Sequence, residues 1–354
     1  MRRSPRPSRA AVLALVLAVP LAGGCTAGSA PAAGPGSPAP TGRPATSPTG
    51  APVPASAPAG ARPAVTAVVA GRLPAGTSRA VAVTDGRRIV VLGGLGPGDA
   101  STDRVLTIDP ATGRAMAAGR LALAVHDASG AWLRGRAVVI GGGAPSTVAT
   151  VQAWTAPPGG PGGARRVAGA LPRPRSDSTA ATLGGTAYVV GGFDGARLDR
   201  TILATTDGTS FRAVGRLRVG VRYAAVGVAD GAVWVAGGVT GTGALTDAVQ
   251  RFDPRTGRTA LVGRLPEPLG HATALALDGQ LLVAGGRRAA GAAGAVAAIL
   301  RLDPRTGAWS RAGRLPGPRS DAAGVTVGGR AWLIGGETGG PGAPLATIVA
   351  VSVR

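Results

Sequence analysis

The chain has 354 residues, of which 45% are hydrophobic and 16% charged, so it contains enough apolar material for a full core. Its 60 glycines and 30 prolines require many turns, which argues against a helical bundle. All 38 basic residues are arginine, and the 17 acidic residues leave a formal net charge of +21, which favours anionic partners. The single cysteine excludes an internal disulfide framework and a thiolate zinc cluster.

The N-terminus has the pattern of an export signal. Four arginines precede the apolar run "AAVLALVLAVPLAGG" at 10–24. As a helix this run would extend only about 22 Å, which is short for a membrane span and typical of a signal-peptide core. We therefore predict that residues 1–24 are a signal peptide and that the chain is exported by the general secretion route.

Cys25 directly follows this run, and the stretch "LAGGC" resembles the lipobox of bacterial lipoproteins. The resemblance implies that the Cys25 sulfur receives a diacylglycerol, which would anchor the protein to the outer face of the bacterial cytoplasmic membrane. Ala22 stands where leucine is usual. Ordinary signal cleavage beside an unmodified cysteine, followed by secretion, is therefore the alternative.

Residues 26–63 consist almost wholly of Ala, Pro, Gly, Ser and Thr, without aromatic or acidic side chains. Such a segment buries too little apolar area to offset its chain entropy. Residues 25–63 should thus comprise the lipidated cysteine and a disordered tether with a root-mean-square reach of about 35 Å. The folded domain is expected to span residues 64–354.

A repeat of nearly 50 residues organises this domain. Apolar strands such as "IVVLGG" and "AWLIGG" end in glycine pairs, which begin at Gly93, Gly141, Gly191, Gly237, Gly285 and Gly335. The intervals of 46 to 50 residues are typical of a propeller or a solenoid. Each unit has four short strand patterns, as a propeller blade does. The sequence therefore predicts an all-β, six-bladed β-propeller with four-stranded blades.

Turn residues separate the predicted strands. Dipeptides that tolerate positive φ precede the glycine-pair strands and are expected to form two-residue hairpins. They are Asp85-Gly86, Gly184-Gly185, Asp230-Gly231, Asp278-Gly279 and Gly328-Gly329. Each third strand is followed by a turn, which reads D-P-x-T-G at Asp109, Asp253 and Asp303. In this turn Asp caps the backbone, Pro fixes φ and Gly adopts the left-handed conformation.

Each end of the domain contains only part of a blade, and the two parts together would make a complete one. Residues 64–74 have the pattern of a fourth strand that precedes the first complete unit, whereas 345–353 have that of a third strand with nothing after it. An open ring would leave a long unpaired strand edge. We expect the N-terminal strand to close the last blade.

The glycine pair after an apolar strand, the D-P-x-T-G turn and the L-P-x-P-R phrase together resemble the kelch repeat, over essentially all of residues 64–354. The resemblance implies a kelch-type propeller that joins its ends in this way. The aromatic residue expected after the turn glycine is present as Trp309 but replaced at Ala115 and Thr259. The aromatic residues before the glycine pairs, Tyr188, Trp234 and Trp332, are predicted to lie in the core.

Polar residues should converge at the mouth of the central channel, because first strands begin and second strands end on that face. The sixth residue after each "GRL" or "GAL" leucine gives Arg79, Asp127, Asp177, Tyr223, His271 and Asp321. Nearby positions and the loops after the glycine pairs add His126, Arg175, Arg222, Arg319, Phe193, Asp194, Arg287, Arg288 and Glu337. Kelch proteins generally bind partners with this face. We interpret this set as a binding surface.

Some of these residues also have a structural interpretation. Arg175 and Arg319 lie in P-R-S-D phrases, where they can satisfy turn backbone. His126 and His271 can simply line the channel, because no residue that would orient them is identified. The arginines of the repeated "GRL" phrase, such as Arg120 and Arg264, are expected to be solvated scaffold residues.

The predicted function is non-catalytic binding of a protein, a glycan or an anionic envelope polymer, by a monomer without cofactor or metal. The alternative is an envelope carbohydrate-active enzyme that uses Asp177, His271 or Asp321. The kelch resemblance implies bacterial sialate epimerases as its precedent. The sequence contains no G-x-S-x-G, H-E-x-x-H or Walker motif. A nucleic-acid partner is disfavoured, because the basic residues do not alternate with aromatic ones.

Overall fold

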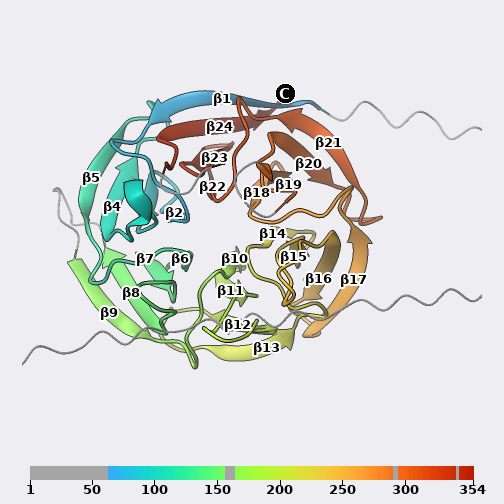
Figure 1. Ribbon diagram of the computed structural model, residues 1–354, viewed down its shortest axis with the longest axis horizontal. Coiled ribbons are helices and arrows are strands. Elements are labelled where there is room, and N and C mark those ends of the chain that lie inside the picture. The colour runs from blue at the N-terminus through green and yellow to red at the C-terminus, as the bar shows by residue number, and fades with distance from the viewer. Residues whose placement is uncertain (1–62, 156–163, 290–293, 340–342) are drawn as a thin grey trace, which may run out of the picture. The chain divides into compact units, whose positions relative to one another are not determined.

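The computed structural model describes residues 63–155, 164–289, 294–339 and 343–354. In these residues, 24 β-strands form six four-stranded antiparallel sheets. The sheets surround a central axis as the blades of a propeller (Figure 1). This confirms the predicted all-β, six-bladed fold. The predicted signal peptide, Cys25 and tether up to residue 62 lie outside the described residues.

Blades 1 to 3 follow one another along the chain. Blade 1 consists of β2 (Val81–Thr84), β3 (Ile89–Leu92), β4 (Arg104–Ile108) and β5 (Ala115–Arg120), with a short 3-10 helix, η1 (Pro97–Asp99), between β3 and β4. Blade 2 consists of β6 (Ser129–Leu133), β7 (Arg136–Ile140), β8 (Thr150–Thr155) and β9 (Ala164–Ala170). Blade 3 consists of β10 (Thr179–Leu183), β11 (Thr186–Val190), β12 (Thr201–Thr205) and β13 (Arg212–Arg216).

The second half of the ring repeats this order. Blade 4 consists of β14 (Ala225–Ala229), β15 (Ala232–Ala236), β16 (Ala248–Asp253) and β17 (Arg258–Arg264). Blade 5 consists of β18 (Thr273–Leu277), β19 (Gln280–Ala284), β20 (Ala298–Leu302) and β21 (Trp309–Arg314). Blade 6 consists of β22 (Ala323–Val327), β23 (Arg330–Ile334), β24 (Thr347–Val353) and β1 (Val65–Arg72). In every blade the first of these four strands lies next to the axis (Figure 1).

The N-terminal strand closes the ring, as predicted. β1 pairs antiparallel with β24, from Val65 opposite Val353 to Arg72 opposite Thr347. The Leu73 N–H also donates to the Ala346 carbonyl at 2.7 Å. Blade 6 therefore contains strands from both ends of the domain, and β24 has no free edge.

Four of the five predicted hairpin turns are two-residue turns with positive φ at both positions, namely 184–185, 230–231, 278–279 and 328–329. The prediction for Asp85-Gly86 was wrong, because Thr84 pairs with Ile89 and leaves a four-residue connection. There the Asp85 carboxylate accepts the N–H groups of Arg87 and Arg88 at 2.9 and 2.7 Å.

Blade 2 also has a two-residue turn, which the sequence prediction missed. Arg134 and Gly135 have φ of 48° and 76°. An arginine in the left-handed region is uncommon, so the dipeptide did not carry a recognisable turn pattern.

The D-P-x-T-G turns have the predicted geometry. The Asp109 and Asp253 carboxylates each accept the backbone N–H two residues later, at 2.9 Å. The glycines that end the three turns, Gly113, Gly257 and Gly307, have φ of 70°, 70° and 71°. Their N–H groups donate to the carbonyl of the leading aspartate at 2.8 Å.

The glycine pairs connect neighbouring blades. Gly237 has a φ of 66°, and a Cβ there would lie 2.0 Å from the Leu269 carbonyl oxygen. Gly238 donates its N–H to that carbonyl at 2.8 Å. The same bond occurs at every repeat, with acceptors Val125, Arg175, Val221, Arg319 and Thr77. Only glycine permits this close approach, which explains why the pair recurs in each blade.

The core lies between the blades. Trp234 and Trp332 are buried as predicted, and Trp154 is buried with them. Tyr188 is half-buried and packs edge-on against Phe252, with ring centroids 5.9 Å apart. The leucines of the "GRL" and "GAL" phrases are buried in the loops that lead into the blades.

Two buried glutamines bind backbone groups of the loops that lead into blades 2 and 4. Both of these loops lack the Leu-Pro dipeptide found in the other four. In the loop before blade 4, Gln250 accepts the N–H groups of Arg218 and Val219 at 2.8 and 3.0 Å and donates to the Val219 carbonyl at 3.0 Å. In the loop before blade 2, Gln152 accepts the Leu123 N–H at 2.8 Å and donates to the Leu123 carbonyl at 3.2 Å. The amide thus satisfies backbone groups in the two loops that have no proline.

We expect Gln250→Leu to lower the free energy of unfolding by about 1–3 kcal/mol, because it leaves partly buried backbone groups without their partner. Urea unfolding followed by circular dichroism measures this change. The double change Gln250→Leu with Arg218→Pro should recover part of the loss, since proline has no N–H to satisfy. A Gln250→Leu protein as stable as the original would contradict this role.

Candidate functional site

Six residues form a closed circle around the propeller axis, one from the loop that leads into each blade. This axial ring consists of Arg79, Asp127, Asp177, Tyr223, His271 and Asp321. Each N–H donates to the carbonyl of the ring residue in the preceding blade, at 2.8 to 3.0 Å, and the Arg79 N–H donates to Asp321. The backbone therefore links all six blades at the channel mouth.

All six ring residues adopt the left-handed conformation, with φ between 51° and 58°. Non-glycine residues are uncommon there, and each costs of order 1 kcal/mol or more. The six hydrogen bonds and the packing of the surrounding loops hold the strained backbone in place. The spacing in the sequence located the whole ring, and the structure brings its members together as expected.

Arg79 crosses the centre of the mouth. Its guanidinium donates to Asp127 Oδ2 at 3.2 Å, to Glu337 Oε1 at 3.3 Å and to the Tyr223 hydroxyl at 3.5 Å. The Tyr223 hydroxyl donates to Asp127 Oδ2 at 3.3 Å. Since Arg79 and Tyr223 come from blades 1 and 4, these contacts span the channel. Below them lies a channel cavity of about 190 Å³ lined mainly by small residues of the innermost strands.

A second cluster joins blades 5 and 6. Arg287 donates to Asp321 Oδ2 at 2.8 Å and to Ser320 Oγ at 2.9 Å, and it also pairs with Glu337. His271 Nδ1 lies 2.6 Å from Asp321 Oδ1. The His271 ring stacks on Tyr223 with centroids 4.1 Å apart. Two of the three predicted loops after glycine pairs, those of Arg287 and Glu337, thus reach the ring.

The other side of the mouth combines arginine with aromatic rings. Arg222 donates to Asp177 Oδ2 at 3.1 Å, and its guanidinium carbon lies 5.3 Å from the Phe193 ring centroid and 5.4 Å from that of Tyr223. His126 Nδ1 lies 2.8 Å from Ser101 Oγ. These contacts fix the orientation of Arg222 and His126.

The protonation of the mouth follows from burial and charge. Burial would raise the pKa of Asp321, but the hydrogen bond from His271 and the charges of His271, Arg79 and Arg287 lower it to about 2. For Asp127 burial dominates and raises the pKa, although Arg79 opposes the shift. Burial also raises the pKa of Tyr223, so its hydroxyl stays a donor. Burial and the charge of Arg79 lower the pKa of His126, which favours the neutral ring.

The carboxylates of the mouth lie beneath the basic side chains. The side chains of Asp127 and Asp177 are 7% exposed and that of Asp321 is 2% exposed, whereas those of Arg79 and Arg222 are 22% and 35% exposed. Beside the ring, between blades 4 and 5, lies a pocket of about 470 Å³. Its polar lining residues are Arg222, Tyr223, His271, Arg287 and Arg288. A molecule that approaches this face therefore meets guanidinium groups and rings before carboxylates.

Three of the predicted site residues occupy other environments. Arg175 and Arg319 are buried. Arg175 pairs with Asp199 and donates to the Thr201 carbonyl at 2.9 Å, and Arg319 donates to the Thr347 carbonyl at 3.1 Å. Asp194 accepts two N–H groups of its own turn, at 2.8 and 2.9 Å. All three bind local backbone, which matches the structural interpretation weighed for the two arginines.

The sequence prediction missed two residues that support the mouth. Ser101 binds His126, and Ser320 accepts from Arg287. The predicted Arg288 lines the pocket and pairs with Glu267 at 2.6 Å. Ser320 is adjacent to the predicted Asp321, so local position could have indicated it. Ser101 belongs to a longer loop, and its contact with His126 had no signal in the repeat.

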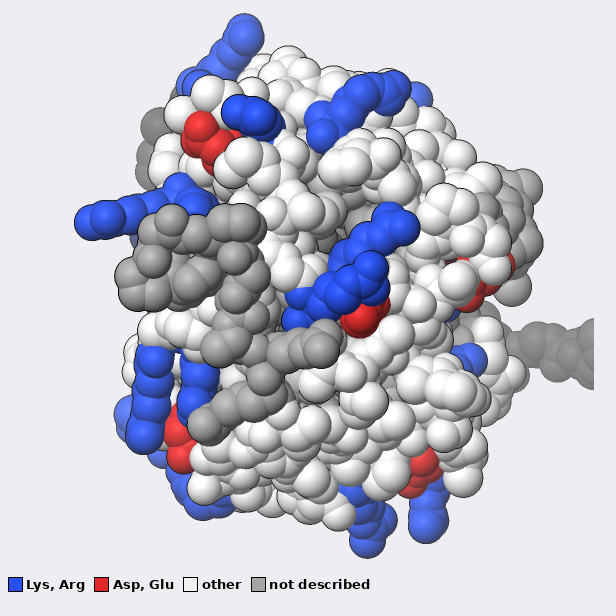
Figure 2. Space-filling model, turned by 90° about the vertical axis from the view of Figure 1, so that its left-hand side faces the viewer, with Lys and Arg blue, Asp and Glu red and all other residues white. Residues whose placement is uncertain are grey.

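The remaining positive charge is spread over the rim. On the side of the ring shown in Figure 2, arginines stand singly or in small groups over the surface, and a few acidic residues lie among them. The repeated "GRL" arginines behave in this way. Arg120 and Arg264 pair with Asp103 and Asp247, each at 2.8 Å, and remain exposed. The mouth therefore differs from the rim in the burial of its arginines, not in the presence of arginine.

Two further observations concern metal binding and membrane-spanning helices. Within the described residues, no group of three or more His, Cys, Asp or Glu side chains has the arrangement of a metal site. None of the described segments forms a helix with the length and apolar character that crossing a bilayer requires.

Comparison with known proteins gives no further assignment. The chain matches no protein-family model and no curated protein. The kelch interpretation therefore depends on the repeated motifs and remains a prediction.

Proposed function

We propose that this chain is an exported, lipid-anchored propeller of the kelch type that binds an anionic partner at its channel mouth without catalysis. The partner is an acidic protein, a glycan or an anionic envelope polymer. The propeller itself is consistent with a binding module. Lipidation of Cys25 would attach it to the membrane, and residues 26–63 would hold it away from the surface.

One observation carries the proposal, namely the burial of the mouth carboxylates beneath arginine, tyrosine and histidine. Arg222, which is more exposed than Arg79 and Arg287, stacks near two rings and is oriented by Asp177. A guanidinium held in this way loses little side-chain entropy when it binds a carboxylate or phosphate. Selective anion binding is therefore what this surface supports best.

A second candidate is the envelope carbohydrate-active enzyme. The hydrogen bond between His271 and Asp321 favours it, because it fixes the imidazole beside a pocket. The pairing of the carboxylates with arginine argues against it, since a catalytic acid or base must reach the substrate proton. NMR exchange spectroscopy can measure whether the protein accelerates the interconversion of sialate anomers. Acceleration would favour the enzyme over the binding module.

We expect Arg222→Glu to weaken binding of an acidic polymer about 10-fold or more, because it removes a charged contact and adds repulsion. Poly-L-glutamate, dextran sulfate and polyphosphate are suitable probes for the protein, glycan and polymer classes. Biolayer interferometry of the full chain at about 150 mM salt measures the affinity, and this salt concentration screens distant charges.

Arg264→Glu is the matched control, because it changes the net charge equally on the rim and also breaks one ion pair. We expect it to change the affinity less than about 3-fold at the same salt concentration. Equal losses for the two variants, both disappearing at high salt, would mean diffuse attraction by the +21 charge and no dedicated site. Thermal unfolding of both variants checks that the fold is intact.

A further inference from the structure

A second pocket, of about 660 Å³, lies between blades 3 and 4. β11, β12 and β13 supply most of its lining, and the D-P-R-T-G turn of blade 4 contributes Pro254, Arg255 and Gly257. The hairpin turn at 184–185 and this D-P-R-T-G turn join strands at the ends opposite the glycine pairs. The pocket is therefore on the face away from the channel mouth.

A small side chain in the middle of blade 3 contributes to the space of the pocket. Tyr188, Ala204 and Arg212 form one cross-strand row of blade 3. In the same row of blades 4 and 5, the residues that correspond to Ala204 are Arg251 and Arg301. With alanine in the middle of the row, the space beside Tyr188 stays open. Blades 2 and 6 also carry alanine at this position, as Ala153 and Ala350, so blade 3 differs here from blades 4 and 5.

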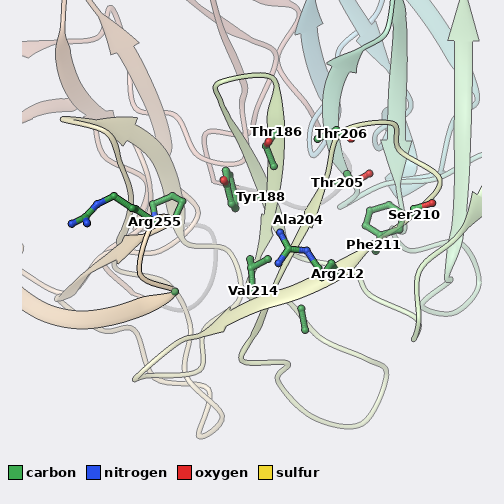
Figure 3. A pocket seen from close by; sticks show the side chains of 13 residues that line it. Thr186, Tyr188, Ala204, Thr205, Thr206, Ser210, Phe211, Arg212, Val214 and Arg255 are labelled. Carbon is green, nitrogen blue, oxygen red and sulfur yellow. The ribbon is translucent and has the colours of Figure 1, made fainter.

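The lining combines two aromatic rings with basic and hydroxyl groups. In Figure 3 the Arg212 guanidinium lies in the middle of the labelled residues, between Tyr188 and Phe211, whereas Arg255 points away. No Asp or Glu is among the lining residues. Within the described part of the chain, Arg212 forms no ion pair, unlike Arg79, Arg222 and Arg287 at the mouth. Its charge is free to meet a ligand.

We propose that this pocket binds an acidic saccharide of the hexuronic acid kind. Arg212 would pair with the carboxylate, and Tyr188 and Phe211 would pack against the C–H groups of the sugar ring. The hydroxyls of Thr186 and Ser210 are placed in the lining to bind sugar hydroxyls. The site is separate from the channel mouth, so it does not depend on the function proposed for that face.

Size and composition together favour this ligand class. Small-molecule sites commonly measure about 300–1,000 Å³ and combine rings with a few polar groups, as this pocket does. A simple carboxylate would use Arg212 but leave the two rings without contacts. A neutral sugar would leave the unpaired guanidinium without an anion.

Isothermal titration calorimetry of the full chain with glucuronate, glucose and acetate tests the proposal. We expect glucuronate to bind with a Kd of about 0.1–1 mM, and glucose and acetate to bind at least about 10-fold more weakly. Arg212→Gln should weaken glucuronate binding about 10-fold or more. Ala204→Arg copies the side chain found in the same row of blades 4 and 5 and should abolish binding by filling the pocket.

Two matched variants control for charge and for the other site. Arg258→Gln removes an exposed arginine of the neighbouring blade that does not line the pocket, and Arg222→Glu alters the channel mouth. Both should bind glucuronate as the original chain does. Arg212 is itself exposed, so its replacement should leave the thermal unfolding temperature unchanged even if Ala204→Arg does not fold.

Four results would overturn the proposal. The first is the absence of glucuronate binding up to about 10 mM. The second is an equal loss in Arg212→Gln and Arg258→Gln, which would indicate nonspecific attraction. The third is acetate binding as tight as glucuronate binding, which would show that the rings do not recognise a sugar. Loss in Arg222→Glu alone would place the ligand at the channel mouth instead.

Discussion

Deletion of residues 64–71 is expected to unfold the whole propeller at physiological temperature, although it removes most of a single strand. β1 contributes seven paired positions to β24 and the buried Val65, and its loss exposes the full edge of β24. It also removes the contact that holds the two ends of the domain together. A domain stabilised by about 5–15 kcal/mol does not tolerate the loss of a strand and of ring closure together.

Thermal unfolding by circular dichroism and size-exclusion chromatography measures this effect. Deletion of eight residues from the predicted tether, 40–47, is the control of equal length and should leave the unfolding temperature unchanged. A synthetic peptide of residues 64–74 added to the shortened chain should restore the transition, because it can pair with β24. A shortened chain that melts at the original temperature without the peptide would show that closure by β1 does not matter.

The architecture could be predicted because its determinants are local and repeated. The glycine pairs are required because a Cβ on Gly237 would lie only 2.0 Å from the Leu269 carbonyl oxygen, and the same close approach recurs in every blade. The D-P-x-T-G turns likewise need Asp and Gly at fixed positions. The turn predictions failed in blades 1 and 2, where the first two strands are connected through other residues or a longer loop. Asp85 capped a longer connection, and Arg134 adopted a left-handed conformation that sequence patterns do not anticipate.

The site could be predicted only in part, because side-chain partners come from different blades. Spacing located all six members of the axial ring, since their backbone positions repeat. It could not separate Arg222, which lies at the mouth beside rings, from Arg319, which is buried against Thr347. This difference depends on what lies near each guanidinium in three dimensions. The pocket beside Tyr188 was missed for the same reason, because a small Ala204 is informative only in its register with Tyr188 and Arg212.

Burial of the two structural arginines changes which substitutions test binding. Burial lowers the pKa of Arg319 to about 10, which still leaves the residue charged at neutral pH beside the Thr347 carbonyl. Replacing it by Glu would place an unpaired carboxylate in the core, which costs several kcal/mol. A loss of binding in that variant would report unfolding. Arg222 is therefore the residue of choice for the charge-reversal experiment.

Cys25→Ser should move the protein out of the membrane fraction, which is the largest change expected for any single substitution outside the propeller. The proposed anchor is a thioether on the cysteine sulfur, and a serine oxygen does not provide the thiolate nucleophile that forms it. Without two acyl chains, the tether and the propeller have no stable attachment. Fractionation of cells and medium, followed by immunoblotting, measures the redistribution.

Labelling with radioactive palmitate supplies the second measurement, because an uncleaved apolar segment at 10–24 could itself retain the chain. Incorporation into the original protein should fall to background in Cys25→Ser. Thr26→Ser, a change of similar size at the adjacent position, should leave both the label and the membrane fraction as they are. A protein that never incorporates the label, and that is found in the medium with Cys25 present, would establish ordinary signal cleavage. The propeller would then act as a secreted binding module, because nothing in its own described strands requires the anchor.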